Sequence, residues 1–153
     1  MNKEIVVIGI GNIFRKDDAI GVKTLEFLEK KGVPKNVKLI CGDISGLDII
    51  KYFDHKLVII IDAVKMGKKA GTITVFNPKE TKFKTFDEGV STHGISLQET
   101  LKIALELNKN CNIVIVGIEP YNVNFGINLA DRLKKKIPFI CNKIVEIIKD
   151  FKH

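Results

Sequence analysis

Short, continuous apolar runs alternate with amphipathic stretches along this chain. Continuous runs are typical of strands buried on both faces, and stretches with apolar residues three and four apart are typical of helices. This alternation predicts a mainly parallel sheet with helices on both faces. The predicted strands are 5–10, 37–41, 57–61, 72–76 and 113–116.

The fourth predicted strand differs from the others. Gly71 precedes it, its residues partly alternate, and the connection from the third strand is too short for a crossover helix. Parallel neighbours need such a crossover, so we predict that strand 72–76 is antiparallel. The sequence therefore predicts a five-stranded, mostly parallel sheet with one antiparallel strand.

Four amphipathic stretches predict helices. The first helix begins near Asp17 or Asp18 and ends at Gly32. The third helix begins near Ser96, because Ser96 and Glu99 have the spacing of a capping box. A short second helix carries Leu47, Ile50 and Phe53, and a long last helix begins at Pro138 and carries Ile140, Ile144, Ile147, Ile148 and Phe151.

The composition fits one soluble domain. With 153 residues, 45% of them hydrophobic, the chain can bury one sizeable core, and we expect a single domain over residues 1–153. No apolar run reaches the roughly 18 residues of a membrane span and no signal peptide is recognisable, so we expect a cytoplasmic monomer without membrane contact. Cys41, Cys111 and Cys141 lie in apolar surroundings and are predicted to be buried, reduced thiols.

The formal net charge of +7 raises the question of an acidic partner. The lysines are spread along the chain, many on the polar sides of helical patterns, which favours an ordinary solvated surface over a nucleic-acid interface. Arginine, the usual bidentate ligand of bases and phosphates, occurs only at Arg15 and Arg132. We therefore expect no nucleic-acid partner.

The stretch after the first predicted strand has the strand, glycine turn and helix of a nucleotide site, but its side chains do not suit a phosphate. Gly9 and Gly11 lie between a strand and a helix, but Phe14 stands where a dinucleotide motif needs its third glycine. Asp17 and Asp18 place negative charge at a helix N-terminus, where they would repel a phosphate. This end of the helix attracts cations, although either aspartate alone could simply cap the helix.

Two further reactive side chains are predicted at the same edge of the sheet. Asp62 ends the apolar third strand, where a carboxylate must be solvated, paired or bound to metal, and His93 lies in the loop before the third helix. A histidine in such a loop could equally be an ordinary exposed residue. Together with Asp18, these residues would form an O, O, N site open to a divalent ion such as nickel, zinc or iron.

Four segments of the chain carry a family resemblance. They are GIGNIFRKDDAIGV at 9–22, IDAV at 61–64 followed by GTITVF at 71–76, STHGISL at 91–97, and VGIEP at 116–120. In order and spacing they resemble the nickel-iron hydrogenase maturation endopeptidases. The resemblance implies a single three-layer αβα domain with a twisted five-stranded sheet, phosphorylase/hydrolase-like. It also implies an aspartyl-type protease that removes the C-terminal extension of a nickel-iron hydrogenase large-subunit precursor after nickel insertion.

The resemblance also implies roles for single residues. Asp18, Asp62 and His93 match the family's metal-contacting, catalytic residues, whereas Asp17 matches a neighbouring acid that is no ligand, and we expect it to cap the helix. The metal is implied to be nickel held by the precursor, or another divalent ion in its place. The family often has DGGTxG after its second strand, whereas residues 41–46 read CGDISG, a difference that concerns which hydrogenase is processed.

Alternatives exist for both the mechanism and the function. Hydrolysis could proceed by metal polarisation of the carbonyl group or by a carboxylate-activated water. A glycine-asparagine turn after an apolar strand also occurs in peptidyl-tRNA hydrolases, although their RHNxG segment is missing here. A non-catalytic, nickel-sensing hydrogenase chaperone would keep the same residues without cutting.

Overall fold

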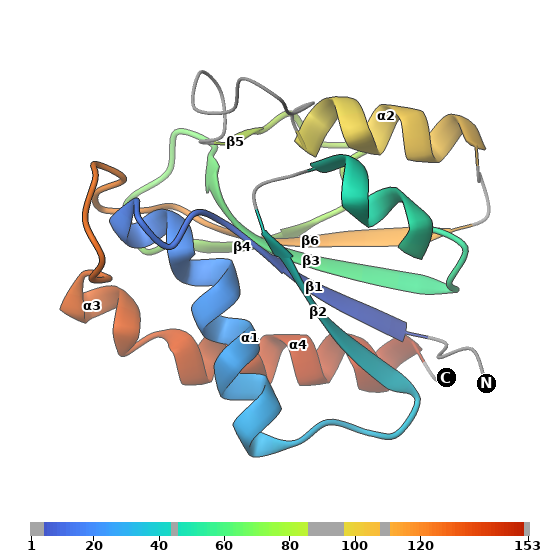
Figure 1. Cartoon of the computed structure of the whole chain (residues 1–153), viewed down its shortest axis with the longest axis horizontal. Helices are drawn as coiled ribbons and strands as arrows, with labels where there is room; N and C mark the ends of the chain where they lie inside the picture. Colours follow the sequence, from blue (N-terminus) through green and yellow to red (C-terminus); the bar gives the residue numbers. More distant parts are fainter. Residues whose placement is uncertain (1–4, 44–45, 86–96, 108–110, 152–153) are drawn as a thin grey trace.

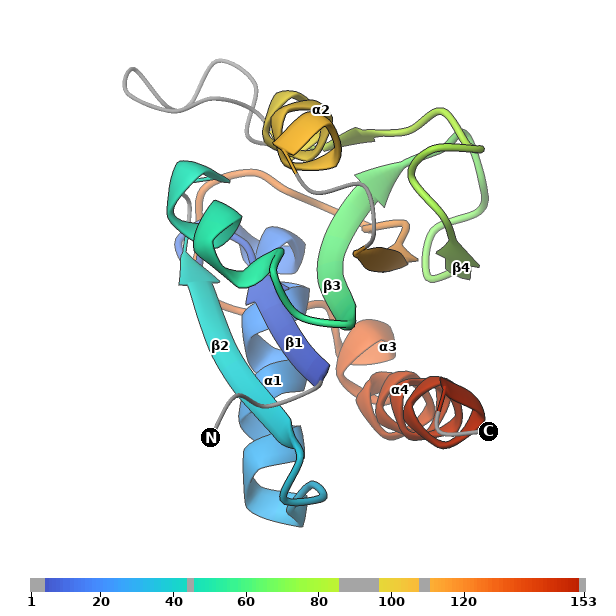
Figure 2. The same cartoon turned by 90° about the vertical axis from the view of Figure 1, so that its right-hand side faces the viewer.

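The computed structural model (Figure 1) describes residues 5–43, 46–85, 97–107 and 111–151. A sheet lies between two helical layers (Figure 2). The strands are β1 (Ile5–Ile10), β2 (Val37–Asp43), β3 (Leu57–Lys65), β4 (Ile73–Phe76), β5 (Lys84–Thr85) and β6 (Asn112–Ile118). The helices are α1 (Ile20–Lys31), α2 (Leu97–Leu107), α3 (Asp131–Lys134) and α4 (Ile137–Phe151), with 3-10 helices η1 (Lys16–Ala19) and η2 (Gly46–Tyr52).

The main sheet has the strand order β2-β1-β3-β6-β4. β1, β2, β3 and β6 pair in parallel, and β4 runs antiparallel to β6, with Ile73 opposite Ile118. This confirms the predicted five-stranded, mostly parallel sheet with one antiparallel strand. The two-residue strand β5, which the sequence pattern does not predict, pairs antiparallel with β3 at Val64 and Lys65.

β3 lies in the middle of the sheet and is buried on both faces over residues 57–64. Because side chains alternate along a strand, Ile59 and Ile61 pack in the apolar cluster under α1 and α4. Ile60 and Val64 pack in the second cluster, under α2 and η2. The side chains of this one strand therefore contribute to the apolar clusters on both faces of the sheet.

The helices follow the predicted pattern with local differences. The first begins with η1, α1 starts at Ile20, and Gly32 ends it with a φ of 91°. The predicted second helix is the 3-10 helix η2, α4 begins one residue before Pro138, and α3 is not predicted. Ser96 of the predicted capping box lies outside the described residues. Within the described ranges, no helix is long and apolar enough to cross a bilayer.

One of the three cysteine predictions is wrong. Cys111 and Cys141 are buried, but Cys41 is exposed. Cys41 lies near the end of β2, an edge strand whose one neighbour in the sheet is β1. An edge strand keeps one side open to solvent, so apolar neighbours in the sequence do not guarantee burial.

Candidate active site

Glycines bring the start of α1 against the ends of β1 and β3. A β-carbon at Gly21 would lie 2.2 Å from the carbonyl oxygen of Ile61 and 2.3 Å from that of Ile10, so only glycine fits there. A β-carbon at Gly9 would in turn lie 2.4 Å from the carbonyl oxygen of Gly21. These glycines permit close backbone packing at the carboxyl edge of the sheet, where ligands of open α/β sheets bind.

Asp18 lies in η1, inside the turn that joins β1 to α1. The residue is 4% exposed, and its Oδ2 accepts a hydrogen bond of 3.0 Å from the backbone N–H of Asn12. The backbone of Gly11, with a φ of 149°, passes so close that a β-carbon there would lie 1.8 Å from the Asp18 carbonyl oxygen. The turn thus wraps tightly around Asp18 and fixes it at the sheet edge.

Asp62 lies on the central strand β3 and is 3% exposed. By alternation it shares a face with Ile60 and Val64, which pack under α2. η1 contacts β3, so Asp18 and Asp62 belong to the same edge of the sheet. Burying two carboxylates at one edge is costly unless each is hydrogen-bonded, paired or bound to a cation.

His93, the third predicted site residue, lies outside the described residues, in segment 86–96. This segment joins β5, which pairs with β3 two residues after Asp62, to α2, which covers the same face of the sheet. Within the ranges that the structure describes, no three histidine, cysteine, aspartate or glutamate side chains gather as in a metal site. The predicted set, in which His93 joins Asp18 and Asp62, stays a prediction.

Asp17 does not cap the first helix, contrary to the prediction. The N-cap of α1 is Ala19, without a side-chain hydrogen bond. The fully buried carboxylate instead accepts hydrogen bonds from three backbone N–H groups, those of Tyr121 at 2.8 Å, Asn122 at 2.9 Å and Ala130 at 2.8 Å. The 3-10 turn directs Asp17 at the irregular chain between β6 and α3, whose backbone amides need acceptors.

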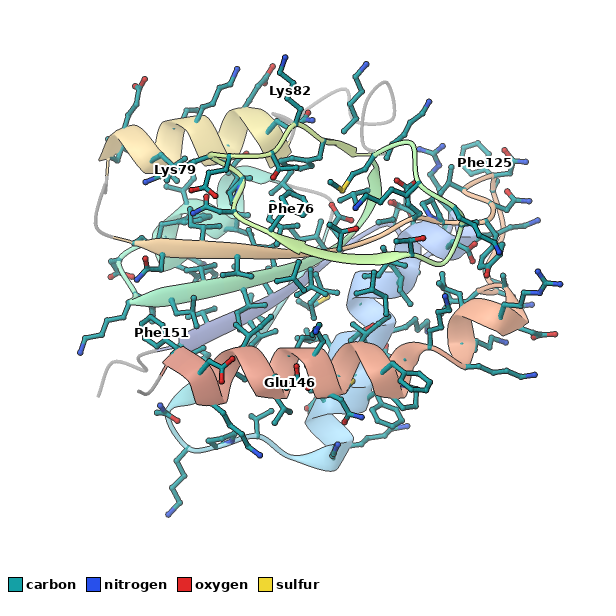
Figure 3. The ribbon with its side chains drawn as sticks, turned by 180° about the vertical axis from the view of Figure 1, so that it is seen from behind. Phe76, Lys79, Lys82, Phe125, Glu146 and Phe151 are labelled. Carbon is teal, nitrogen blue, oxygen red and sulfur yellow. The ribbon has the colours of Figure 1, made fainter. Side chains whose placement is uncertain are left out.

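Backbone hydrogen bonds also join the β1–η1 turn to the chain between β6 and α3. The N–H of Lys16 donates to the carbonyl of Gly126 at 3.0 Å, and the N–H of Gly126 donates to the carbonyl of Phe14 at 2.8 Å. Phe125, which is 81% exposed, projects from this chain (Figure 3). The two loops form one connected wall beside Asp18.

Glu119 holds the turn that follows β3. The residue is 7% exposed, and its Oε1 accepts hydrogen bonds from the backbone N–H groups of Met66 and Lys68, the latter at 3.1 Å. Its own N–H donates to the carbonyl of Thr72 at 3.0 Å. The sequence reasoning gave Glu119 no role, although a carboxylate directly after an apolar strand is the signal that identified Asp62.

Two cysteines are unsuited to nucleophilic chemistry. Burial raises the pKa of the Cys111 and Cys141 thiols from 9.0 to about 11. Both therefore stay protonated near neutral pH, whereas the thiolate is the reactive form of cysteine. Neither side chain is prepared to act as a nucleophile.

The chain is similar to known hydrogenase maturation proteins along most of its length. The family model of the HycI hydrogenase maturation proteases matches residues 22–147. The hydrogenase expression/formation protein HupD of Bradyrhizobium diazoefficiens is 28% identical over 154 residues, which cover 95% of this chain and 80% of that protein.

Solved structures of such proteins share the fold. The hydrogenase maturating endopeptidase HybD from E. coli has a TM-score of 0.79 and 25% identity, over 95% of this chain and 92% of that one. The NiFe hydrogenase maturation protease HycI from Thermococcus kodakarensis has a TM-score of 0.72 and 28% identity, over 96% and 93% of the two chains.

Proposed function

The chain belongs to the hydrogenase maturation protease family, and on this premise we propose that it removes the C-terminal extension of a nickel-iron hydrogenase large-subunit precursor after nickel insertion. The family match covers most of the chain, and solved maturation endopeptidases align with 95% of it or more. The match favours the protease over the peptidyl-tRNA hydrolase that the glycine-asparagine turn also allowed.

Asp18 and Asp62 are the proposed contacts to the nickel of the precursor. Both are buried, and the contact of η1 with β3 at the carboxyl edge of the sheet is the observation that supports this proposal. His93 is the proposed third contact, because its segment joins the two elements next to Asp62. Carboxylate oxygens and an imidazole nitrogen suit nickel, or another divalent ion in its place, that arrives as part of the substrate.

Contact with the precursor's nickel would hold the peptide bond beside these residues, and proximity itself accelerates the reaction. Two routes to hydrolysis use the site: the ion polarises the carbonyl group, or Asp18 or Asp62 accepts a proton from the attacking water. In both, water adds to the carbonyl carbon, the C–N bond breaks and the leaving amine takes up a proton. No covalent intermediate with the protease is required.

Cleavage of the precursor with and without nickel tests this function. The full chain is incubated with each form, and mass spectrometry detects the released extension. We expect cutting of the nickel-loaded form, with a loss of about 100-fold or more in Asp18→Asn, Asp62→Asn and His93→Ala. Asp150→Asn removes an exposed carboxylate from α4 and is the matched control, which should cut at the wild-type rate.

Two results would contradict the proposal in different ways. Equal cutting of nickel-loaded and nickel-free precursor by all variants would rule out recognition through the metal. Binding of the nickel-loaded precursor without release of its extension would identify a nickel-sensing chaperone and rule out the protease.

A further inference from the structure

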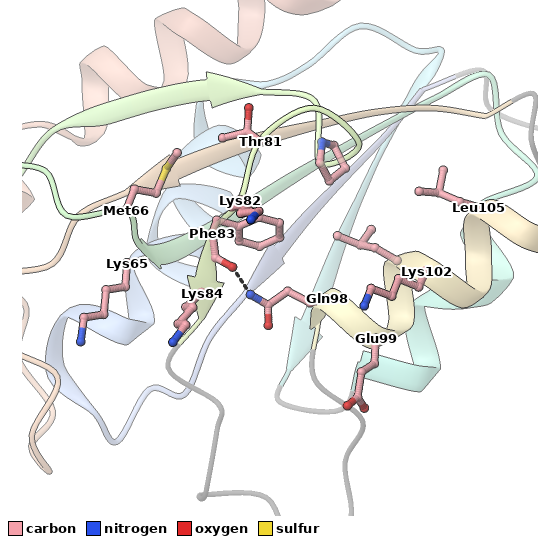
Figure 4. Close-up of a pocket in the computed structure, with 12 residues that line it drawn as sticks. Lys65, Met66, Thr81, Lys82, Phe83, Lys84, Gln98, Glu99, Lys102 and Leu105 are labelled. Carbon is pink, nitrogen blue, oxygen red and sulfur yellow. Dashed lines mark hydrogen bonds between the residues drawn. The ribbon is translucent and has the colours of Figure 1, made fainter.

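A cavity of about 800 Å³ lies between α2 and the chain that leads from β4 into β5 (Figure 4). One wall comes from α2, including Gln98, Leu101 and Lys102, and the opposite wall comes from residues 78–84. The Nε2 of Gln98 donates a hydrogen bond to the carbonyl of Phe83, which ties the two walls together. The volume is in the range of known ligand pockets, and neither Asp18 nor Asp62 is among the described residues that line it.

Lysines dominate the charge around this cavity. Its lining includes Lys65, Lys82, Lys84 and Lys102, all exposed, and Lys82 lies beside α2 in Figure 3. In the part of the chain that the structure describes, none of the four forms an ion pair. Glu99 is the one acidic residue of the described lining. The cavity therefore offers an excess of positive charge to an incoming ligand.

Apolar side chains also line the cavity. Met66, Phe83, Leu101 and Leu105 contribute, and the Phe83 ring packs against that of Phe76 with ring centroids 5.1 Å apart. A ligand with both carboxylates and apolar side chains fits this lining, as an acidic peptide segment does. Nucleic acid fits less well, because no described lining residue is an arginine and the one aromatic ring among them is already packed.

The cavity begins a short distance beyond Asp62. Lys65 follows Asp62 by three residues on β3, which separates the two by about 10 Å at roughly 3.3 Å per residue. An extended peptide covers the same distance in about three residues. A protein tail cleaved beside Asp62 would therefore reach the cavity at Lys65 about three residues past the cut bond.

We propose that this cavity binds the C-terminal extension of the precursor through the carboxylate groups of that extension. The assignment rests on the proposed function, because it concerns the part of the substrate beyond the cleaved bond. With the nickel held at one end and the carboxylates at the other, the tail lies extended past the end of β3. The cavity thus contributes substrate affinity, while the chemistry stays at the sheet edge.

Removal of the four lysine charges tests the assignment. The cavity variant combines Lys65→Gln, Lys82→Gln, Lys84→Gln and Lys102→Gln. The control variant removes four exposed lysines from the helical layer on the other side of the sheet, by Lys30→Gln, Lys134→Gln, Lys135→Gln and Lys149→Gln. Fluorescence anisotropy measures the binding of a labelled synthetic peptide with the sequence of the extension. Cleavage of the nickel-loaded precursor is measured in parallel.

We expect the cavity variant to bind the peptide about tenfold more weakly, because several exposed ion pairs are lost together. The KM for cleavage should rise by a similar factor with little change in kcat. The control variant should keep wild-type affinity. A peptide whose acidic residues are changed to amides and whose C-terminus is amidated should bind the wild-type chain as weakly as the cavity variant binds the original peptide.

Equal weakening in the two lysine variants would overturn the assignment, because overall charge would then explain the binding. Undiminished peptide binding by the cavity variant would overturn it as well. Failure of the proposed function would give a different result. The wild-type chain would then leave the nickel-loaded precursor uncut, whether or not it binds the peptide.

Discussion

The backbone of Gly21 lies directly against the carbonyl oxygen of Ile61, so that a β-carbon at position 21 would approach this oxygen to 2.2 Å. Ile61 immediately precedes Asp62, and Gly21 follows Asp18 by three residues. The separation of the two carboxylates therefore depends on how closely α1 approaches β3. The absence of one side chain sets the geometry of the candidate site.

Gly21→Ala should destabilise the fold and reduce cleavage. The added methyl group would meet two backbone carbonyl oxygens, so we expect a loss of about 3 kcal/mol or more in the free energy of unfolding, measured by urea denaturation. Gly32→Ala is the control, because nothing lies within 4 Å of its added β-carbon and only its backbone conformation, with φ 91° and ψ 147°, opposes it, at a cost of about 1–3 kcal/mol. A folded Gly21→Ala variant that cuts at the wild-type rate would contradict this dependence.

Asp17→Ala should loosen the chain between β6 and α3. It leaves three part-buried backbone N–H groups without their acceptor, and each lost hydrogen bond costs about 1 kcal/mol because water partly replaces the carboxylate. Hydrogen exchange should become faster at Tyr121, Asn122 and Ala130. Asp131→Asn, which changes an exposed carboxylate in the first turn of α3, should leave the exchange unchanged. Unaltered exchange in Asp17→Ala, combined with loss of nickel recognition, would show that Asp17 is a ligand after all.

Glu119→Ala should release the turn after β3, and Glu119→Gln should retain it. Glutamine keeps a side-chain carbonyl oxygen for the N–H groups of Met66 and Lys68, whereas alanine offers none. We expect a loss of about 2 kcal/mol in the free energy of unfolding for alanine and about half of that for glutamine. Thermal denaturation measures both losses. Equal losses would mean that the negative charge matters more than the hydrogen bonds.

Cys41 should react with iodoacetamide in the native protein, whereas Cys111 and Cys141 should not. Cys41 is exposed, and the other two are buried with a pKa of about 11. At pH 8, a thiol with that pKa is a thiolate in about one molecule per thousand. Mass spectrometry locates the modified residues, and urea-unfolded protein, in which all three react, is the control. Rapid native-state modification of Cys141 would contradict its burial.

The same buried thiols predict a loss of stability at alkaline pH. Their pKa is about 11 in the folded protein against 9.0 ordinarily, so the unfolded chain releases these protons first as the pH rises. Their contribution is fully present below about pH 9 and is lost as the pH rises from there through about 11. Urea denaturation across this window should show the decline. It should be shallower in a variant that combines Cys111→Ala and Cys141→Ala, and an unchanged slope would contradict the assignment.

Local patterns were enough to predict the five strands of the main sheet. The continuous apolar run 57–61 reads as a strand buried on both faces, and β3 is one, although it continues to Lys65. The short connection before residue 73 indicates an antiparallel strand because it leaves no room for a helix, and β4 is antiparallel. The buried strand and the antiparallel strand are both determined by residues that lie close together in the sequence, so a local pattern predicts them.

The roles of Asp17 and Glu119 depend instead on partners far along the chain. Asp17 meets amides 104, 105 and 113 residues away, and Glu119 meets amides 53 and 51 residues away. A local pattern shows that an aspartate can cap a helix, but the folded chain decides which donors reach it. The exposure of Cys41 is similar, because it follows from the place of β2 at the edge of the sheet.

The long-range bonds of Asp17 also bear on when the candidate site forms during translation. A ribosome releases the chain from its N-terminus, so Asp17 emerges 104 residues before its first partner, Tyr121. β1, β2 and β3 can pair earlier, but the wall beside Asp18 stays incomplete until Ala130 has left the exit tunnel. We therefore expect a nascent chain to pair β1, β2 and β3 first and to complete this wall only after Ala130 has emerged.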